Sequence, residues 1–246
     1  MPYAIFDRDS FIARTGLGPD MKVLIIGPDS KAAIQIAKNV ETTVAIAVSN
    51  PQQSRGLRAV SPHNLNPLIA EFTHLPFKNE AIDIIFSYHS LNSVPKTQVP
   101  KMLCQAHSML KQDRRFSSMV WSLKPTNKAQ ESHLMMLEIL KQLDLLHLHR
   151  FDEVSRWLEA AGFKEITMEL VTQQLSVPEN WVHSHLNRIN EIVEEYGQIN
   201  GSLPVDIDNS LEVLKKHVKE YGEELLPSIH FTAVRYVGLD GIDMIQ

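Results

Sequence analysis

The sequence has one cysteine and no excess of basic residues, and both features exclude classes of protein. A single cysteine, Cys104, leaves no disulfide within the chain and no cysteine-based metal centre. The net charge is −5 and the sequence pI is about 6.1, so no basic surface that would follow a phosphate backbone is expected. The sequence therefore predicts neither a disulfide-stapled secreted domain nor a protein whose main partner is a nucleic acid.

Long hydrophobic runs are also missing. The most apolar long stretch, residues 133–150, is interrupted by Glu138, Lys141, Gln142 and Asp144, so we expect no membrane span. Residues 1–11 carry acidic side chains and lack the apolar run of a signal peptide. These absences, with the lone cysteine, lead us to expect a cytoplasmic protein.

Short β-rich runs alternate with helical patterns along the chain, which is typical of a parallel sheet covered by helices on both faces. Strands are expected at 22–27, 43–48, 67–72, 82–87 and 116–122, all of them nearly continuous apolar runs. Residues 164–177 and 230–238 alternate instead, and would pair with each other as an antiparallel edge. The pattern predicts an α/β fold with a seven-stranded, mostly parallel sheet whose last strand is antiparallel.

Helical periodicity separates these strands. It is clearest at 98–112, and it recurs after the first strand, at 127–148 and at 151–161, where Gly162 provides a stop. Between the last two strands lies a long excursion, 178–227, with two amphipathic helices joined around Gly197, Gly201 and Pro204. We expect one domain over 1–246, with the helical insertion at 178–227 lying over one end of the sheet as a lid.

The stretch "VLIIGPDSK" (23–31) predicts a strand, a tight turn and a helix, a common place for a nucleotide-like ligand. Such loops usually carry two or three glycines, whereas this one has only Gly27. Asp29 or Ser30 would cap the helix that follows. The loop alone is therefore weak evidence for any ligand.

The middle of the chain carries a more specific pattern. "AEFTHLPFKNEAIDIIFSYHSLNSV" (70–94) resembles the class I S-adenosylmethionine-dependent methyltransferases, in particular the type-11 branch that acts on small molecules. "MLCQAHSMLK", "WLEAAGFKEI" and "TAVRYV" follow in the order of that family. The resemblance implies a Rossmann-like sheet with S-adenosylmethionine as cofactor at the carboxyl ends of its strands, and a small-molecule acceptor.

The resemblance also nominates cofactor-binding residues. These are Gly27, Pro28, Asp29, Ser49, Glu71, Phe72 and Tyr88.

The cofactor loop departs from the family pattern. Asp29 and Lys31 stand at its second and third glycines, and Ile25 and Ala47 stand where acids are expected; only Glu71 keeps both charge and place. A missing ribose carboxylate removes a charge-assisted hydrogen bond of about 1.5–3 kcal/mol. Asp29 has two readings, a helix N-cap or a polar contact to the methionine part of the cofactor.

Methyl transfer from a sulfonium needs mainly positioning, so the family has no universal catalytic motif. His89 is nominated as a general base, and Asn92 and Trp181 as substrate contacts. Packing of the inserted helix is the simpler role for Trp181. The histidine pairs at 147/149 and 183/185 lack acidic or cysteine partners at metal-binding spacing, so no metal is expected.

Two functions remain in competition. One is a methyltransferase acting on a small, apolar or amphipathic acceptor; the other is a catalytically inactive methyltransferase fold with a regulatory or scaffolding role. A nicotinamide-dependent oxidoreductase is disfavoured because GxGxxG spacing is absent. The Leu- and Met-rich segment 134–146 would fill a core, line an apolar channel or form a homo-oligomer interface.

Overall fold

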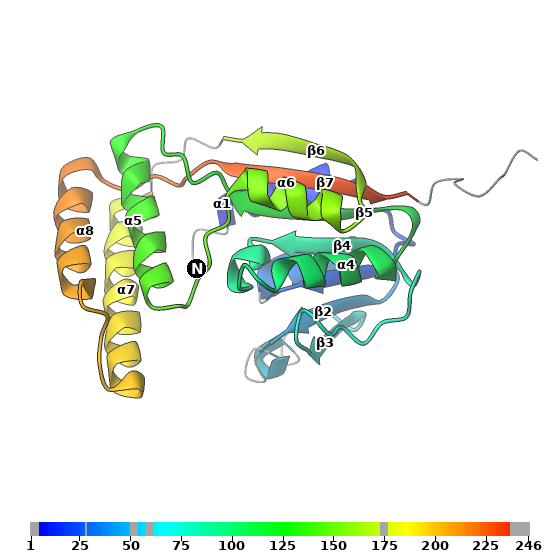
Figure 1. The fold of residues 1–246 in the computed structure, drawn as a ribbon, viewed down its shortest axis with the longest axis horizontal. Helices are drawn as coiled ribbons and strands as arrows, with labels where there is room; N and C mark the ends of the chain where they lie inside the picture. The colour runs from blue at the N-terminus through cyan, green and yellow to red at the C-terminus, as the bar shows by residue number, and fades with distance from the viewer. Residues whose placement is uncertain (1–4, 28, 50–53, 58–61, 173–176, 237–246) are drawn as a thin grey trace, which may run out of the picture.

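A computed structural model describes residues 5–27, 29–49, 54–57, 62–172 and 177–236 of the chain. Seven strands form one sheet in the order β3-β2-β1-β4-β5-β7-β6 (Figure 1). They are β1 (Val23–Ile26), β2 (Val44–Val48), β3 (Leu65–Ile69), β4 (Ile82–Tyr88), β5 (Leu110–Trp121), β6 (Lys164–Val171) and β7 (Ser228–Arg235). The first five pair in parallel and β7 runs antiparallel to both neighbours, so the predicted topology is confirmed.

The continuous apolar runs form the centre of the sheet. Every residue of β1, β2 and β4 is buried, as both faces of a parallel sheet require. The predicted limits of the third and fifth strands were wrong: β3 ends at Ile69, which places Phe72 in the following turn, and β5 begins at Leu110. Pro67 is tolerated within β3 because this strand lies at the sheet edge.

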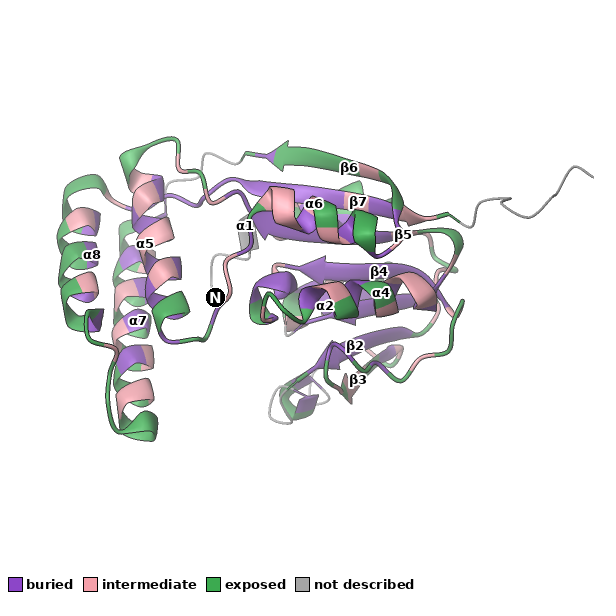
Figure 2. Cartoon of the chain, in the orientation of Figure 1, coloured by how far each residue is buried: buried purple, intermediate pink, exposed green. Residues whose placement is uncertain are grey.

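Helices cover both faces of the sheet (Figure 2). On one face, α4 (Val99–Met109) and α6 (Phe151–Ala160) pack on residues such as Leu24 and Phe116. On the other, α2 (Ser30–Lys38) and α1 (Ile5–Arg14) pack on Ile25 and Phe86. The sequence analysis did not predict α1, which brings the buried Phe11 against the middle of the sheet.

Three helices form a separate layer beyond the carboxyl ends of the parallel strands (Figure 1). They are α5 (Lys128–Gln142), α7 (Glu179–Asn200) and α8 (Ile207–Tyr221), and their apolar faces share one cluster of buried side chains. The predicted insertion contains α7 and α8, but α5, which precedes it, belongs to the same layer. Within the described part of the chain, no helix has the length and apolarity to cross a membrane.

The helix predicted over 127–148 ends earlier than expected. Asp144 adopts a left-handed backbone (φ 53°), which cannot continue an α-helix, so α5 stops at Gln142. His147 and His149 consequently lie in the irregular segment between α5 and α6 rather than on a helix.

At the amino ends of the central strands, Asp83 ties three strands together. Its carboxylate accepts the Lys22 backbone N–H (3.0 Å) and lies 2.9 Å from the Lys111 Nζ. Burial raises the pKa of Asp83, but these two hydrogen bonds and the charges of Lys111 and Arg114 outweigh it, so the pKa is lowered overall. The carboxylate therefore stabilises the sheet in its charged form, at the edge opposite the carboxyl ends.

Two histidines are held in the core in a form that resists protonation. His230 on β7 is 4% exposed and contacts the Ser117 hydroxyl at 2.8 Å. Burial, with the Arg14 charge as a smaller contribution and the Glu169 charge in opposition, lowers the pKa of His230 to about 4. Burial likewise lowers the pKa of His149, against the effect of its backbone hydrogen bonds. Both favour the neutral imidazole.

These histidines should make the fold sensitive to acid. In the unfolded chain they bind protons below about pH 6.5, whereas in the folded chain His230 does so only near pH 4. Their contribution to the free energy of unfolding is therefore complete above pH 6.5 and is lost as the pH falls toward 4, by up to about 3 kcal/mol for His230.

Urea unfolding at several pH values measures this loss. The double variant His230→Phe with Ser117→Ala should show a weaker dependence of the free energy of unfolding on pH between pH 6.5 and 4. The surface variant His63→Gln should leave that dependence unchanged. An undiminished slope in the double variant would contradict the assignment to His230.

Candidate functional site

The predicted site residues gather at the carboxyl ends of four adjacent parallel strands. Gly27 follows β1, Ser49 follows β2, Glu71 lies two residues beyond β3, and His89 follows β4. Because the strand order reverses between β1 and β4, this edge contains the topological switch point of the sheet, where open α/β folds bind ligands. The structure thus brings these four positions to one edge.

Gly27 is required by packing within the site itself. Its backbone φ is +119°, and a Cβ added there would overlap with the Ser90 Oγ and lie 2.5 Å from the Ser90 Cβ. Ser90 begins the 3-10 turn η2 (Ser90–Ser93) after β4, and its hydroxyl donates to the Tyr88 carbonyl at 3.0 Å. The turn after β1 therefore lies directly against the turn after β4.

Asp29 has a structural role that the sequence anticipated. Its carboxylate accepts the Ala32 backbone N–H at 2.8 Å and caps the start of α2. Of its two readings, the N-cap is the one observed. Pro28, the residue before it, lies outside the described residues.

Ser49 and Glu71 present polar groups toward solvent. Ser49 is exposed. The Glu71 side chain is 80% exposed, with one carboxylate oxygen 3.2 Å from the His74 Nδ1. Phe72 is 9% exposed and joins the core beneath α4. At this edge, Ser49 therefore offers a hydroxyl and Glu71 a carboxylate, while the Phe72 ring is buried in the core.

After β4, the rings of Tyr88 and His89 lie in different environments. Tyr88 is buried and its ring contacts Phe11 of α1 at 5.4 Å. His89 is half-buried, adopts a left-handed backbone (φ 48°), and stacks on Trp121 with ring centroids 4.4 Å apart. Tyr88 thus acts as a core residue of the site, while His89 stays partly accessible beside it.

The Ser87 hydroxyl and the Asn92 amide, near the end of β4, are buried. Among the described residues, no group hydrogen-bonds to the Ser87 Oγ or the Asn92 Nδ2, although Asn92 is only 2% exposed. An unsatisfied buried donor costs about 1–3 kcal/mol. The predicted substrate role of Asn92 stays a prediction.

The turn that carries Asn92 is clamped by the segment before α6. The His147 backbone N–H donates to the Asn92 carbonyl (2.7 Å), and the His149 Nε2–H is shared between the carbonyls of Leu91 and Val94 (3.0 Å each). His149 is therefore a structural hydrogen-bond donor.

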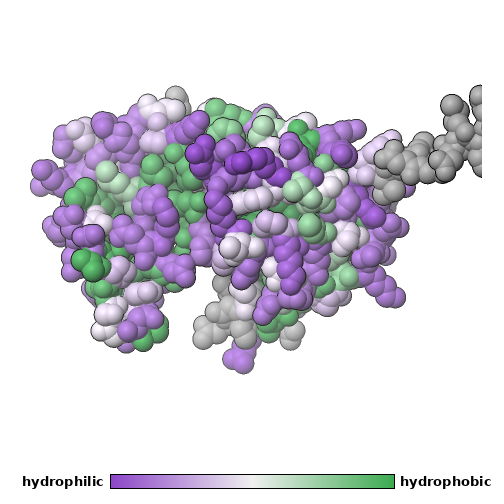
Figure 3. Space-filling model, viewed as in Figure 1, coloured by the Kyte–Doolittle hydropathy of each residue, from purple (hydrophilic) through white to green (hydrophobic). Residues whose placement is uncertain are grey.

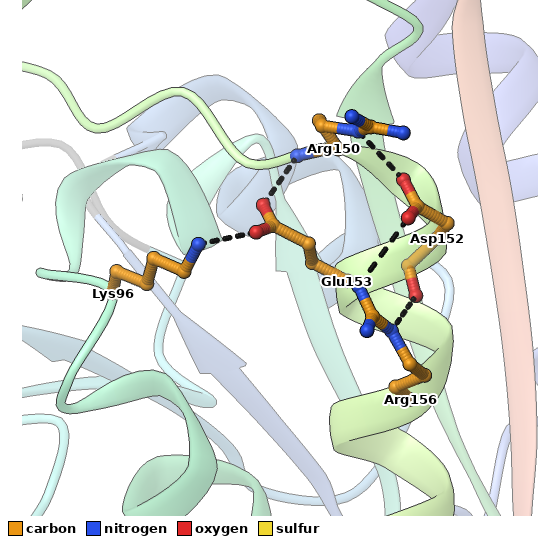
Figure 4. A network of polar contacts seen from close by, with 5 residues as sticks. All are labelled: Lys96, Arg150, Asp152, Glu153 and Arg156. Atoms are coloured by element: carbon orange, nitrogen blue, oxygen red, sulfur yellow. Dashed lines mark hydrogen bonds and ion pairs between the residues drawn. The ribbon is translucent and has the colours of Figure 1, made fainter.

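Figure 4 shows the charged network beside this clamp. The Glu153 carboxylate, near the start of α6, accepts from the Lys96 ammonium and from the Arg150 backbone N–H. Asp152 pairs with the guanidinium groups of Arg150 and Arg156. These exposed pairs add little stability individually, but the Lys96–Glu153 pair links the loop after η2 to α6.

Trp181 lies on α7, half-buried and packed against the apolar cluster of the helical layer. His183 is exposed, and His185 pairs with the buried Glu223 at 3.2 Å. No group of three or more potential metal ligands occurs among the residues described.

The sequence analysis missed Trp121 and His133. Trp121 ends β5 and stacks on His89, and the edge of His133 on α5 meets Trp121 with centroids 5.8 Å apart. The only signal was a tryptophan at the end of a predicted strand, and nothing in the sequence links it to residues in other elements.

The chain was compared with protein-family models, curated proteins and solved structures. Residues 26–117 match the family model described as a methyltransferase domain. A search of curated proteins gives no significant match.

Three solved structures share the fold across nearly the whole chain. The YcgJ protein from Bacillus subtilis is 14% identical with a TM-score of 0.66, covering 97% of this chain and 100% of its own. Phosphoethanolamine N-methyltransferase 2 from Haemonchus contortus, in complex with phosphomonomethylethanolamine and S-adenosylhomocysteine, is 14% identical with a TM-score of 0.60, and the match covers 94% of this chain and 52% of that one. Geranyl diphosphate C-methyltransferase from Streptomyces coelicolor is 12% identical with a TM-score of 0.56, and the match covers 93% of this chain and 78% of that one.

Replacing Gly27 by alanine should destabilise the protein strongly. Backbone strain and overlap with Ser90 together should lower the free energy of unfolding by about 3 kcal/mol or more. Gly201→Ala is the matched control, because Gly201 also has a positive φ (+74°) but no atom within 4 Å of an added Cβ. Its cost should be near 1 kcal/mol. Adding Ser90→Gly to Gly27→Ala should recover the overlap part, and no recovery would contradict this account.

Removing the His149 donor should loosen the turn after β4. His149→Phe keeps a ring against Trp157 but leaves two buried carbonyls without this donor, so stability should fall by about 1–3 kcal/mol. Amide hydrogen exchange at 90–94 should accelerate. His147→Gln keeps the backbone bond to Asn92 and should change stability by less than about 0.5 kcal/mol. Equal effects of the two variants would refute the clamp.

Proposed function

We propose that this chain transfers a methyl group from S-adenosylmethionine to a small, apolar or amphipathic acceptor, because residues 26–117 match the model of a methyltransferase domain and the chain shares the fold of solved methyltransferases. The observation that carries the proposal is the placement of Gly27, Ser49, Glu71 and His89 at one edge of the sheet, at its switch point.

The residues at this edge fit the cofactor. The exposed Glu71 carboxylate would accept the adenine amino group, and the Ser49 hydroxyl would hydrogen-bond to the ribose where the family has an acid. The turn at Gly27 would bring backbone close to the methionine part. When bound, S-adenosylmethionine supplies an electrophilic methyl group on a sulfonium. The protein's task is then to hold the acceptor in line and to exclude water.

His89 would serve as the base when the acceptor loses a proton. His89 is a half-buried residue directly after β4, three positions before the buried Asn92, whose Nδ2 has no hydrogen-bond partner among the described residues; because the His89 Nδ1 is buried, Nε2 is the nitrogen that would face an acceptor. A ring nitrogen within hydrogen-bond reach of an acceptor O–H or N–H would take that proton as the new bond to carbon forms. Asn92 would donate to a polar atom of the same acceptor and orient it.

The helical layer would form the other wall of the acceptor site and close over it as a lid. Apolar side chains gather along the junction between this layer and the sheet (Figure 3). Leu123, Leu148 and Trp181 are partly buried and packed against the cluster that contains Trp121. An apolar or amphipathic acceptor would cover this surface, and the unpartnered polar atoms near β4 would hold its polar end.

We expect the protein to work as a single domain in a reducing cytoplasm, where the exposed thiol of Cys104 stays free.

Calorimetric titration with S-adenosylmethionine and S-adenosylhomocysteine tests the function. Micromolar affinity is expected, and Glu71→Ala should weaken it about tenfold, the effect of losing one charge-assisted hydrogen bond. Asp29→Asn is the matched control. Asparagine also caps helices, so the free energy of unfolding should hardly change and the affinity for the cofactor should stay within about twofold of the original. No heat at millimolar cofactor would exclude the enzyme and favour an inactive binding protein.

A further inference from the structure

A line of directional contacts connects His89 with the helical layer. His89 stacks on Trp121 (4.4 Å, 20° between planes), and the rings of Trp121 and His133 lie perpendicular to each other (5.8 Å, 90°). The His133 Nδ1 accepts the Leu226 backbone N–H at 2.9 Å. The line therefore runs from β4 through the end of β5 to α5 and to the segment that enters β7.

The backbone of His89 is fixed, so its ring orientation depends on its neighbours. Its N–H donates to the Met119 carbonyl of β5 at 2.9 Å, and its left-handed conformation is held by the turn η2. The imidazole then lies between two rings, edge-on to Tyr88 (4.7 Å) and face-on to Trp121. Tyr88 belongs to the sheet core, whereas Trp121 also contacts the helical layer.

Trp121 is itself held from two sides. Its backbone pairs with Ser228 of β7, and its indole packs in the apolar cluster of α5, α7 and α8. His133 is completely buried, and because its Nδ1 accepts a hydrogen bond, its imidazole is neutral with the proton on Nε2. The indole therefore contacts α5 as well as the sheet.

We propose that Trp121 is a positioning residue for His89: the indole sets the plane of the imidazole. Because Trp121 also contacts His133 on α5, the plane of the His89 ring would depend on where the helical layer lies relative to the sheet. This inference rests on the proposed role of His89 as base. A base accepts a proton only within hydrogen-bond reach of the group that donates it. A tilt of the His89 ring should therefore change the rate of proton transfer strongly and the affinity for the cofactor only slightly. Closure of the helical layer over an acceptor would in this way align the base.

The test compares Trp121→Phe, Trp121→Leu and His133→Asn. Phenylalanine keeps a flat face for His89, leucine removes it, and asparagine retains an acceptor for the Leu226 N–H while losing the ring edge. The His89 ring protons, assigned by their loss in His89→Asn, report the stacking by NMR. They should move strongly in Trp121→Leu, less in His133→Asn and little in Trp121→Phe.

Turnover separates positioning from structure. With saturating cofactor and an acceptor found by screening, kcat should fall about tenfold or more in Trp121→Leu and stay near the original in Trp121→Phe. The KM for S-adenosylmethionine should change by less than about twofold in both variants. Leu214→Ala, in α8 on the far side of the layer, is the control for general loosening.

The outcomes distinguish this inference from the proposed function. Unmoved His89 signals in Trp121→Leu, or equal losses of kcat in Leu214→Ala and Trp121→Leu, would overturn the positioning role. Absence of cofactor binding by the unmodified protein would instead overturn the proposed function, while the NMR measurement would still report whether Trp121 and His133 orient the ring.

Discussion

The close approach of Gly27 to Ser90 is the constraint around which the site is arranged. It places the turn after β1 directly on the turn after β4, with no room for a side chain between them. Those turns begin the segments that carry Asp29 on one side and His89 and Asn92 on the other. The glycine that family patterns associate with a ligand is required here by the protein's own packing, so its presence alone says little about binding.

The helical layer is joined to the sheet by polar contacts as well as apolar ones. The segment before β7 is held by the Leu226 N–H on His133, by the Glu223 carboxylate on His185 and by the Glu224 backbone N–H on the Ala129 carbonyl. All three link it to α5 or α7. Because buried polar contacts are directional, they fix how the layer sits over the carboxyl ends in a way that apolar packing alone does not.

Much of the fold could be predicted from the sequence, because buried parallel strands and amphipathic helices leave local patterns. The buried strands, the cap at Asp29 and the antiparallel pairing of the last two strands all follow from periodicity or short-range chemistry. The contacts of His89 with Trp121, and of α5 with α8, could not be predicted, since they join residues distant along the chain and depend on tertiary packing. The sequence could therefore nominate positions that meet at one edge of the sheet, but not the contacts that orient their side chains.

The left-handed backbone of His89 limits what natural variation can do at this position. Such a conformation costs most residues about 1–2 kcal/mol, whereas glycine and asparagine adopt it readily. Drift under selection for stability alone would therefore replace the histidine by one of those two. Selection for the proposed role of His89 as a base would instead keep the imidazole in spite of that cost.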